Sequence, residues 1–229
     1  MQCVILAAGR GTRMKELTEG TPKPMIRVFG KPLLEHKIDM LPDEIDEVIL
    51  VVGYLGPQIR EHFGEEWKGR KMKYVDQTEL NGTWGAVSQA KHLLNEKFLV
   101  TMGDDLYGKE DIATLMKSEH GVLAKHSGEP TLAAMLRANE TGHLTEITEK
   151  PASPEIGLIN TGAYLLTPKF FSYEPIPVNE TEFGLPQTMA VMAKDHPIKI
   201  HLADAWLQVS RPEDIPKAEE FLRERGISE

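Results

Sequence analysis

The sequence predicts an α/β fold in which helices cover both faces of a mixed, mainly parallel central sheet. Apolar runs at 2–7, 47–52 and 98–102 have the length and composition of buried strands. Between them lie amphipathic stretches whose apolar residues recur at helical spacing. Because strands that alternate with helices favour parallel crossover units, the first hundred residues predict a Rossmann-like three-layer sandwich.

The elements follow from these patterns in order along the chain. We expect strands at 2–7, 47–52, 73–75 and 98–102, and helices at 31–41, 55–63 and 84–94. In the second half we expect helices at 112–118, 168–172, 185–194 and 211–225, and strands at 131–138, 144–149, 157–166 and 198–202. Two of these strands are joined only by the turn at 140–142, which predicts an antiparallel or mixed extension of the sheet.

The bulk properties describe one ordinary globular domain. The 229 residues contain no obvious linker or repeat, and the formal net charge of −9 argues against nucleic acid or an anionic membrane as the main partner. No apolar run reaches 18 residues, and the first one ends at Gly9 without a basic segment before it, so we expect no membrane helix, no signal peptide and a cytoplasmic location. The single cysteine, Cys3, lies in an apolar run and is interpreted as a small buried hydrophobe.

A loop with two glycines follows the first strand and carries the clearest chemical signal. Gly9 and Gly11 let the backbone approach a ligand closely, and successive N–H groups in such a loop bind anions. Arg13 and Lys23 add positive charge. The loop lacks the Gly-Lys pair of a P-loop and has Met14 where a dinucleotide fingerprint has its third glycine. On its own it indicates either an anion-binding loop or a structural turn.

Longer strings of residues narrow these possibilities. The segment LAAGRGTRM at 6–14, followed by TPKPM at 21–25, resembles the signature of the sugar-1-phosphate nucleotidyltransferases, also called NDP-sugar pyrophosphorylases. Further segments resemble that family in its own order, over essentially the whole chain: QTELNGT at 77–83, VTMGDD at 100–105, TEKP at 148–151, NTGAY at 160–164 and WLQVSRP at 206–212.

The resemblance implies an enzyme that joins a nucleoside triphosphate to a sugar 1-phosphate and releases pyrophosphate, with Mg²⁺ as cofactor. It implies a single nucleotidyltransferase domain over 1–229, with a nucleotide-binding half at 1–105 and a sugar-binding extension and terminal helix at 106–229. A phosphate monoester is already a competent nucleophile, so this chemistry needs cations and positioning more than a general base. The amide of Gln77 would match the N3–H and carbonyl of uracil or thymine, so UTP or dTTP is favoured as donor, although guanine and cytosine also present edges that this amide could use.

The resemblance also implies the site residues. The catalytic residues would be Arg13, Lys23 and Asp104. The sugar phosphate would contact Glu149, Lys150, Asn160 and Thr161. The metal ligands would be Asp104 and, at the position where the family commonly has an acid, Gln208. The nucleotide would contact Leu6, Ala7, Ala8, Gly9, Gly11, Thr12, Gln77, Gly82, Thr83 and Gly103.

Gln208 is the main departure from the family pattern. A glutamine oxygen can ligate Mg²⁺ but contributes no charge, which leaves two hypotheses: a weakened metal site or an activity that is lost or shifted. Many relatives continue into a left-handed β-helix of hexapeptide repeats, and the sequence contains none. We therefore expect a short form that lacks the acyltransferase activity and trimerisation associated with that domain.

Other interpretations remain open. One is a cytidylyltransferase that acts on a non-sugar phosphate such as phosphocholine, and another is a non-catalytic nucleotide-sugar sensor or regulatory subunit. For single residues, Asp105 is interpreted as a cap of the following segment, and Trp84 as packing rather than a base-stacking platform. Glu149 with Lys150 could form a solvated pair, and Asn160 could be a turn residue at a strand end. The sequence does not predict the oligomeric state.

Overall fold

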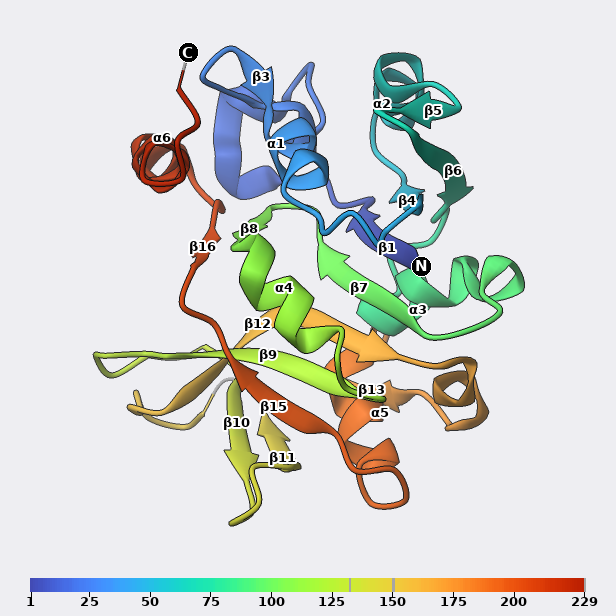
Figure 1. Cartoon of the computed structure of the whole chain (residues 1–229), viewed down its shortest axis with the longest axis vertical. Coiled ribbons are helices and arrows are strands. Elements are labelled where there is room, and N and C mark those ends of the chain that lie inside the picture. The colour runs from blue at the N-terminus through green and yellow to red at the C-terminus, as the bar shows by residue number, and fades with distance from the viewer. Residues whose placement is uncertain (132, 150, 229) are drawn as a thin grey trace.

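The computed structural model describes residues 1–131, 133–149 and 151–228, and its main feature is one large mixed sheet (Figure 1). The strands are β1 Gln2–Ala7, β2 Arg27–Val28, β3 Lys31–Pro32, β4 Glu47–Val52, β5 Glu66–Trp67, β6 Arg70–Asp76, β7 Phe98–Met102, β8 Asp105–Tyr107, β9 Gly121–His126, β10 Met135–Ala138, β11 Leu144–Thr148, β12 Leu158–Leu166, β13 Ile176–Pro177, β14 Phe183–Gly184, β15 Lys199–Leu202 and β16 Trp206–Gln208. The α-helices are α1 Leu33–Asp39, α2 Gly56–Phe63, α3 Gly82–Gln89, α4 Lys109–Leu115, α5 Leu185–Met192 and α6 Ile215–Arg223. Short 3₁₀ helices lie at Thr12–Thr18, Lys23–Met25, Lys91–Leu93, Pro168–Ser172 and Pro212–Asp214.

The sheet has a parallel half and a largely antiparallel half. Its strand order among the described residues is β11-β10-β12-β7-β1-β4-β6-β5, with β9 beside β12 and β15 beside β9. Strands β7, β1, β4 and β6 run parallel, as crossover connections through helices require. Strand β12 pairs antiparallel with β7, β9 and β10. The predicted mixed, mainly parallel sheet with an antiparallel extension is confirmed.

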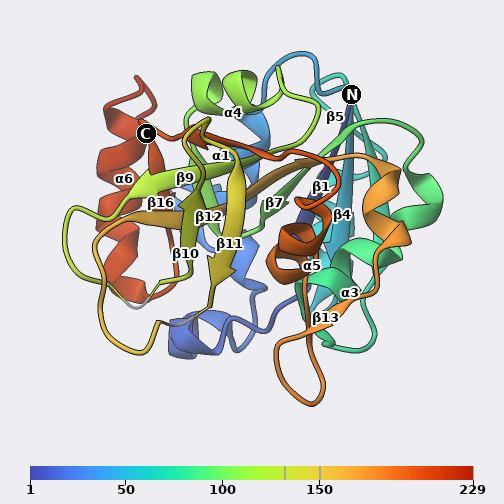
Figure 2. The same ribbon diagram turned by 90° about the horizontal axis from the view of Figure 1, so that it is seen from below.

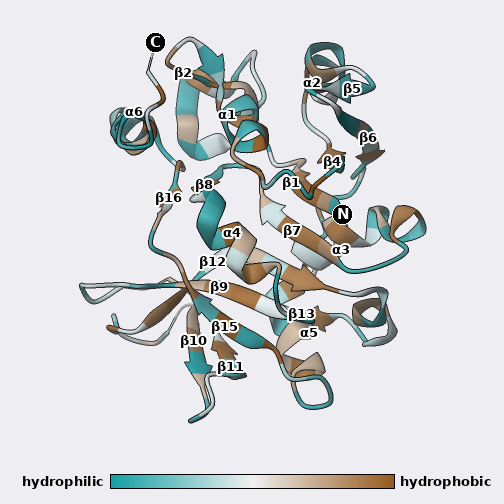
Figure 3. Cartoon of the chain, in the orientation of Figure 1, coloured by the Kyte–Doolittle hydropathy of each residue, from teal (hydrophilic) through white to brown (hydrophobic). Residues whose placement is uncertain are grey.

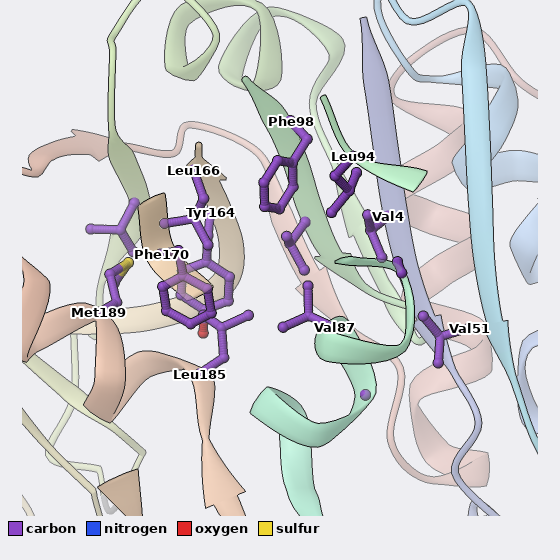
Figure 4. Close-up of a cluster of buried hydrophobic side chains, with 14 of the residues drawn as sticks. Val4, Val51, Val87, Leu94, Phe98, Tyr164, Leu166, Phe170, Leu185 and Met189 are labelled. Carbon is purple, nitrogen blue, oxygen red and sulfur yellow. The ribbon is translucent and has the colours of Figure 1, made fainter. Parts of the chain in front are cut away.

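Helices cover both faces of this sheet, because successive strand residues point to opposite sides. Val4 packs with α3 and α5 in one hydrophobic cluster, whereas Cys3 and Ile5 pack with α1, α2 and α4 in the other. Figure 2 shows α4 on one side of the sheet and α3 with α5 on the other. Figure 4 shows how Val87 of α3 and Leu185 and Met189 of α5 meet the strand residues of the first cluster. The three-layer arrangement is therefore confirmed.

A third, smaller cluster anchors the C-terminal helix. Ala218, Phe221 and Leu222 of α6 pack against Val28 of β2 and Leu106 of β8. The opposite face of α6 is hydrophilic, whereas the central strands β1 and β7 are mainly hydrophobic (Figure 3). Within the described part of the chain, none of the helices combines the length and apolarity that a membrane crossing requires.

Several predicted elements have different bounds, and proline explains two of them. The helix predicted at 31–41 begins only after Pro32, and the one predicted at 211–225 is a 3₁₀ turn followed by α6, whose second residue is Pro216. The helix predicted at 84–94 begins earlier, at Gly82, and ends at Gln89, before a 3₁₀ turn. The strand predicted at 131–138 is regular only as β10.

Strand β9 was not predicted, although it lies inside the antiparallel half. Its apolar core is only Val122–Ala124, between Gly121 and Lys125. Such a run is too short to predict a strand by itself, and its pairing with β12 and β15 supplies the missing stability.

Candidate active site

The ends of two neighbouring strands bring the glycine-rich loop beside Asp104. Strands β1 and β7 are parallel, with Leu6 opposite Met102, so the segments that follow them leave the same edge of the sheet. The N–H of Gly103 donates to the Leu6 carbonyl at 2.9 Å. The predicted phosphate-binding loop and the predicted metal ligand therefore belong to one corner of the fold.

This corner contains a polar cavity of about 490 Å³, called here the cradle. Its described lining is Leu6, Ala7, Gly9, Gly11, Thr12, Arg13, Lys23, Pro24, Gly103, Asp104 and Glu182. The predicted catalytic residues Arg13, Lys23 and Asp104 all lie in it, together with most of the predicted nucleotide contacts. The cradle can hold an anionic group between backbone amides and two cationic side chains.

Gly11 is what allows Lys23 to lie against the loop. Its φ is +65°, and a Cβ there would lie 2.7 Å from the Cβ of Lys23. Both the backbone conformation and the close approach therefore require glycine. The backbone of Lys23 is fixed in turn by Pro22 and Pro24 on either side.

Lys23 and Asp104 form an ion pair through Nζ and Oδ2. The Lys23 side chain is 12% exposed and that of Asp104 27%, so the pair is shielded but open to the cradle. No cluster of three or more acidic, histidine or cysteine side chains suited to a metal occurs in the described residues. Mg²⁺ is commonly held by one or two carboxylates plus substrate phosphates, so Asp104 fits a metal that arrives with a triphosphate.

A second cavity, of about 280 Å³, adjoins the cradle and is called here the base pocket. Its described lining is Leu6, Ala8, Gly9, Gln77, Leu80, Gly82, Thr83, Ala86, Met102 and Glu182. Gln77 is buried, and its Nε2 donates to Asn81 Oδ1 at 3.2 Å and to the Gly82 carbonyl at 3.3 Å. The remaining predicted nucleotide residues thus lie here, and the side-chain amide of Gln77 has a fixed direction.

The segment at 77–83, which lines the base pocket and is called here the base loop, is packed directly against the segment before α5. Gly82 has a φ of +89°, and a Cβ there would lie 2.4 Å from the Phe183 carbonyl oxygen. The Phe183 N–H donates to the Asn81 carbonyl at 2.9 Å, and the Leu185 N–H donates to Thr83 Oγ1 at 2.9 Å. Trp84 is partly buried and packs against the hydrophobic cluster that contains Val87, which agrees with its interpretation as a packing residue.

A third cavity, of about 710 Å³, lies in the antiparallel half and is called here the acceptor cavity. It brings together Glu149, Asn160, Thr161 and Gln208. The fourth predicted sugar-phosphate residue, Lys150, lies outside the described residues. Four predicted residues from three separate segments therefore line one cavity, as a single binding site requires.

Two of these residues also make internal contacts. Asn160 Nδ2 donates to the Tyr164 hydroxyl at 2.7 Å, and Asn160 Oδ1 accepts from the Gly162 N–H at 3.1 Å. Thr161 is buried, and its hydroxyl donates to the Leu123 carbonyl at 2.7 Å. Asn160 lies within β12 rather than at its end, so the alternative interpretation as a strand-end turn residue is wrong.

Asp105 does not cap a helix, contrary to the sequence interpretation. It begins β8, is 2% exposed and lines the acceptor cavity, while α4 is preceded by Gly108. Its Oδ2 accepts from Trp206 Nε1 and from the Tyr107 hydroxyl, each at 3.3 Å. The carboxyl group is buried because β8 pairs with β16 above it.

Burial, reinforced by the charge of Asp104, raises the pKa of Asp105 well above its usual range. Beside it lies Lys37 of α1, whose Nζ donates to the Asp105 carbonyl at 2.5 Å and sits 4.3 Å from the centre of the Tyr107 ring. Burial lowers the pKa of Lys37 to about 8, although Asp105 opposes the shift. Through this hydrogen bond, the buried Lys37 side chain holds the backbone of the residue that follows Asp104.

The sequence did not predict three polar residues around these cavities. Glu182 lines the cradle, the base pocket and the acceptor cavity, and its Oε2 accepts from Asn179 Nδ2 at 2.7 Å. Asn81 fixes the Gln77 amide, and Gln187 lines the acceptor cavity. All three belong to loops or helix starts without hydrophobic periodicity. They can be identified as residues of the site only because they lie next to the predicted site residues in the folded chain.

Comparisons with known proteins agree with this geometry. Residues 2–225 match the family model described as nucleotidyl transferase. The chain is 31% identical over 236 residues to the UTP–glucose-1-phosphate uridylyltransferase AglF of Haloferax volcanii, covering 98% of this chain and 97% of that protein. A putative glucose-1-phosphate thymidylyltransferase from Bacillus anthracis, in complex with a sucrose, matches the fold with a TM-score of 0.83 at 20% identity, covering 100% of this chain and 98% of that one.

A longer relative is similar over only part of its length. The bifunctional protein GlmU of Methanocaldococcus jannaschii is 33% identical over 228 residues, which cover 98% of this chain and 55% of that protein. The chain therefore spans about half the length of this relative.

Proposed function

This chain belongs to the nucleotidyl transferase family, and we propose that it transfers a nucleotidyl group from a nucleoside triphosphate to a sugar 1-phosphate, yielding an NDP-sugar and pyrophosphate. UTP or dTTP is the favoured donor, and UTP is also the donor in the name of the Haloferax relative. The expected partners are these two small molecules.

The observation that carries this proposal is that two consecutive residues line the two different cavities. Asp104 lines the cradle and Asp105 lines the acceptor cavity. The short segment that links β7 to β8 therefore forms the boundary between the two cavities. A triphosphate in the cradle and a sugar phosphate in the acceptor cavity would meet at this boundary. An in-line transfer requires this arrangement, because the attacking and leaving oxygens lie on opposite sides of one phosphorus.

The residues of the cradle suit the charge that develops in such a transfer. Lys23 is held by Gly11 and two prolines, so its ammonium group can stay near the reacting phosphate without reorganisation. Arg13 lines the same cavity and is exposed, which suits a side chain that neutralises the leaving pyrophosphate. Gln77 and the backbone of Gly82 would read the base, and Glu149, Asn160 and Thr161 would face the sugar.

Asp104 and the phosphates of the nucleotide would hold Mg²⁺. When bound, the ion neutralises phosphate charge and orients the triphosphate. Gln208 lines the acceptor cavity rather than the cradle and pairs with Asp105 in the β16–β8 ladder. We therefore propose a metal site with one protein carboxylate, in which Gln208 contributes at most a neutral oxygen.

Pyrophosphate release from the purified chain, measured with each of four NTPs and with dTTP against a panel of sugar 1-phosphates and phosphocholine, tests the proposal. We expect turnover that depends on Mg²⁺, with UTP or dTTP and at least one sugar 1-phosphate. Turnover only with CTP and phosphocholine would instead identify a cytidylyltransferase for a non-sugar acceptor. Nucleotide binding without turnover across the panel would identify a sensor.

A further inference from the structure

The acceptor cavity has a wall at the start of α5 where a glutamine side chain folds over a glycine. A Cβ added at Gly184 would lie 1.7 Å from Gln187 Oε1 and 2.8 Å from Val178 Cγ1. The φ of Gly184 is −95°, which any residue adopts, so backbone conformation does not require glycine here. The missing side chain instead provides the space that the Gln187 amide occupies.

From this position the Gln187 amide reaches across the cavity to Glu149. Its Nε2 donates to Glu149 Oε2 at 3.1 Å, and both residues line the acceptor cavity. Glu149 follows β11 directly and is exposed. An exposed carboxylate has several rotamers of similar energy, so a single fixed hydrogen bond is enough to select its direction.

The start of α5, which carries Gln187, is held by buried side chains and hydrogen bonds, whereas the side chain of Glu149 is exposed. Thr188 Oγ1 donates to the Gly184 carbonyl at 2.9 Å and accepts from the Ile176 N–H at 3.1 Å. Leu185 and Thr188 are fully buried. The direction of the contact is therefore set by α5, and Glu149 is the partner that is oriented.

The rest of the cavity indicates what the oriented carboxylate would meet. Its acidic side chains in the described part of the chain are Asp105, Glu149 and Glu182, of which Glu149 is exposed, and its described lining includes no lysine, arginine or histidine. Amides complete the polar lining: Asn160, Asn179, Gln187 and Gln208. Carboxylate and amide oxygens accept hydrogen bonds from hydroxyl groups and repel an anionic substituent.

We propose that Gln187, in the space left by Gly184, is a positioning residue that turns Glu149 toward the hydroxyls of a sugar 1-phosphate whose ring carries no charged substituent, and so determines acceptor selectivity. The inference rests on the proposed function and deepens it. Gln187 acts through Glu149 and takes no part in the transfer step.

A double-mutant cycle tests this assignment. Gly184→Ala and Gln187→Ala should each raise the KM for the sugar phosphate by roughly 5- to 20-fold, as expected for the loss of one hydrogen bond to a charged group. The KM for the NTP should stay within about twofold. The double variant should be at most slightly worse than Gln187→Ala alone, because alanine at 184 then displaces only the side-chain methyl of Val178, 2.8 Å away.

Two further variants complete the test. Gly20→Ala makes the same chemical change where a Cβ would meet nothing within 4 Å, and it should leave both KM values unchanged. Gln187→Met keeps the side-chain volume without the hydrogen bond, and it provides the same KM comparison even if Gly184→Ala does not fold.

Additive effects in the double variant, or equal rises in both KM values, would overturn the assignment of Gln187. Absence of turnover by the wild-type chain with every sugar phosphate would overturn the proposed function itself, and the inference with it. The two failures are distinguished because wild-type turnover is measured first.

Discussion

The cradle and the acceptor cavity are neighbours that are built in different ways. The cradle is formed by loops that leave two parallel strands, and its described lining includes the cationic side chains Arg13 and Lys23. The acceptor cavity is formed by side chains of antiparallel strands and by the start of α5, and its described charged residues are all carboxylates. The cradle therefore suits polyphosphate, and the acceptor cavity suits a hydroxylated ring.

This contrast separates two kinds of specificity. Backbone amides and cations in the cradle would recognise phosphate, which every nucleoside triphosphate shares. Side chains in the acceptor cavity would recognise the pattern of hydroxyl groups, which differs among sugars. We therefore expect changes in the cradle to reduce the rate for every acceptor, and changes in the acceptor cavity to alter the choice among acceptors.

The largest effect is expected in the cradle. Asp104→Asn should lower kcat by at least roughly 10²-fold, because it removes the carboxylate that would hold the metal against the phosphates. The loss should be similar for all acceptors, as measured by pyrophosphate release. Asp204→Asn makes the same change at an exposed carboxylate and should leave kcat unchanged. Near-normal turnover of Asp104→Asn would contradict the assignment of the cradle.

A smaller effect is expected in the base pocket. Gly82→Ala should raise the KM for the NTP by roughly tenfold, since its Cβ would meet the Phe183 backbone at 2.4 Å and its φ of +89° disfavours alanine. Gly142→Ala is a control for the φ effect, because Gly142 also has a positive φ but its Cβ would meet only the Lys199 ammonium end at 3.0 Å. An unchanged NTP KM in Gly82→Ala would contradict the assignment of this loop to base binding.

The charge of the acceptor cavity gives a prediction about substrates. A sugar 1-phosphate that carries an additional carboxylate should have a kcat/KM roughly 5- to 10-fold lower than the same sugar 1-phosphate without that carboxylate, because of repulsion by the carboxylates that line the cavity. The difference should shrink as salt concentration rises. Glucuronic acid 1-phosphate compared with glucose 1-phosphate, at two ionic strengths, provides the measurement. Equal use of both acceptors at low salt would show that these carboxylates do not face the substrate ring.

The smallest effect is expected where the two cavities meet. Gln208→Asp should increase the affinity of the nucleotide-bound protein for Mn²⁺, used as a spectroscopic probe, by roughly threefold, because a carboxylate replaces a neutral oxygen. The gain is limited because position 208 pairs with the buried Asp105, whose pKa is already raised. Gln208→Asn is the matched neutral control. No gain with aspartate would rule out the hypothesis that Gln208 weakens a metal site.

The parallel half and the cradle could be predicted from the sequence. Strands β1, β4 and β7 have the predicted bounds, because buried parallel strands are continuous apolar runs with polar residues at their ends. Gly9, Gly103 and Asp104 follow those strands closely in the chain, so their positions follow from the fold. Lys23, by contrast, lies further along and is placed by its contact with Gly11. The resemblance to a known family supplied their roles.

The acceptor cavity was less predictable, for a physical reason. Its wall depends on which way side chains point across antiparallel strands and on contacts between distant segments, such as Gln187 with Glu149. Asp105 was misinterpreted because its burial comes from pairing with β16, about a hundred residues later in the sequence. Local patterns contain no information about either contact.

The hydrogen bonds between the base loop and the start of α5 have a consequence for the binding of the two substrates. Asn81 and Thr83 on one side, and Phe183 and Leu185 on the other, join the base pocket to the wall of the acceptor cavity. A nucleotide bound at the base loop would therefore act on the segment that carries the acceptor wall through these hydrogen bonds. Any such coupling would be reciprocal by thermodynamic linkage, so each substrate would change the affinity for the other by the same factor. Binding of the sugar phosphate, measured with and without the nucleotide, would then differ by that factor.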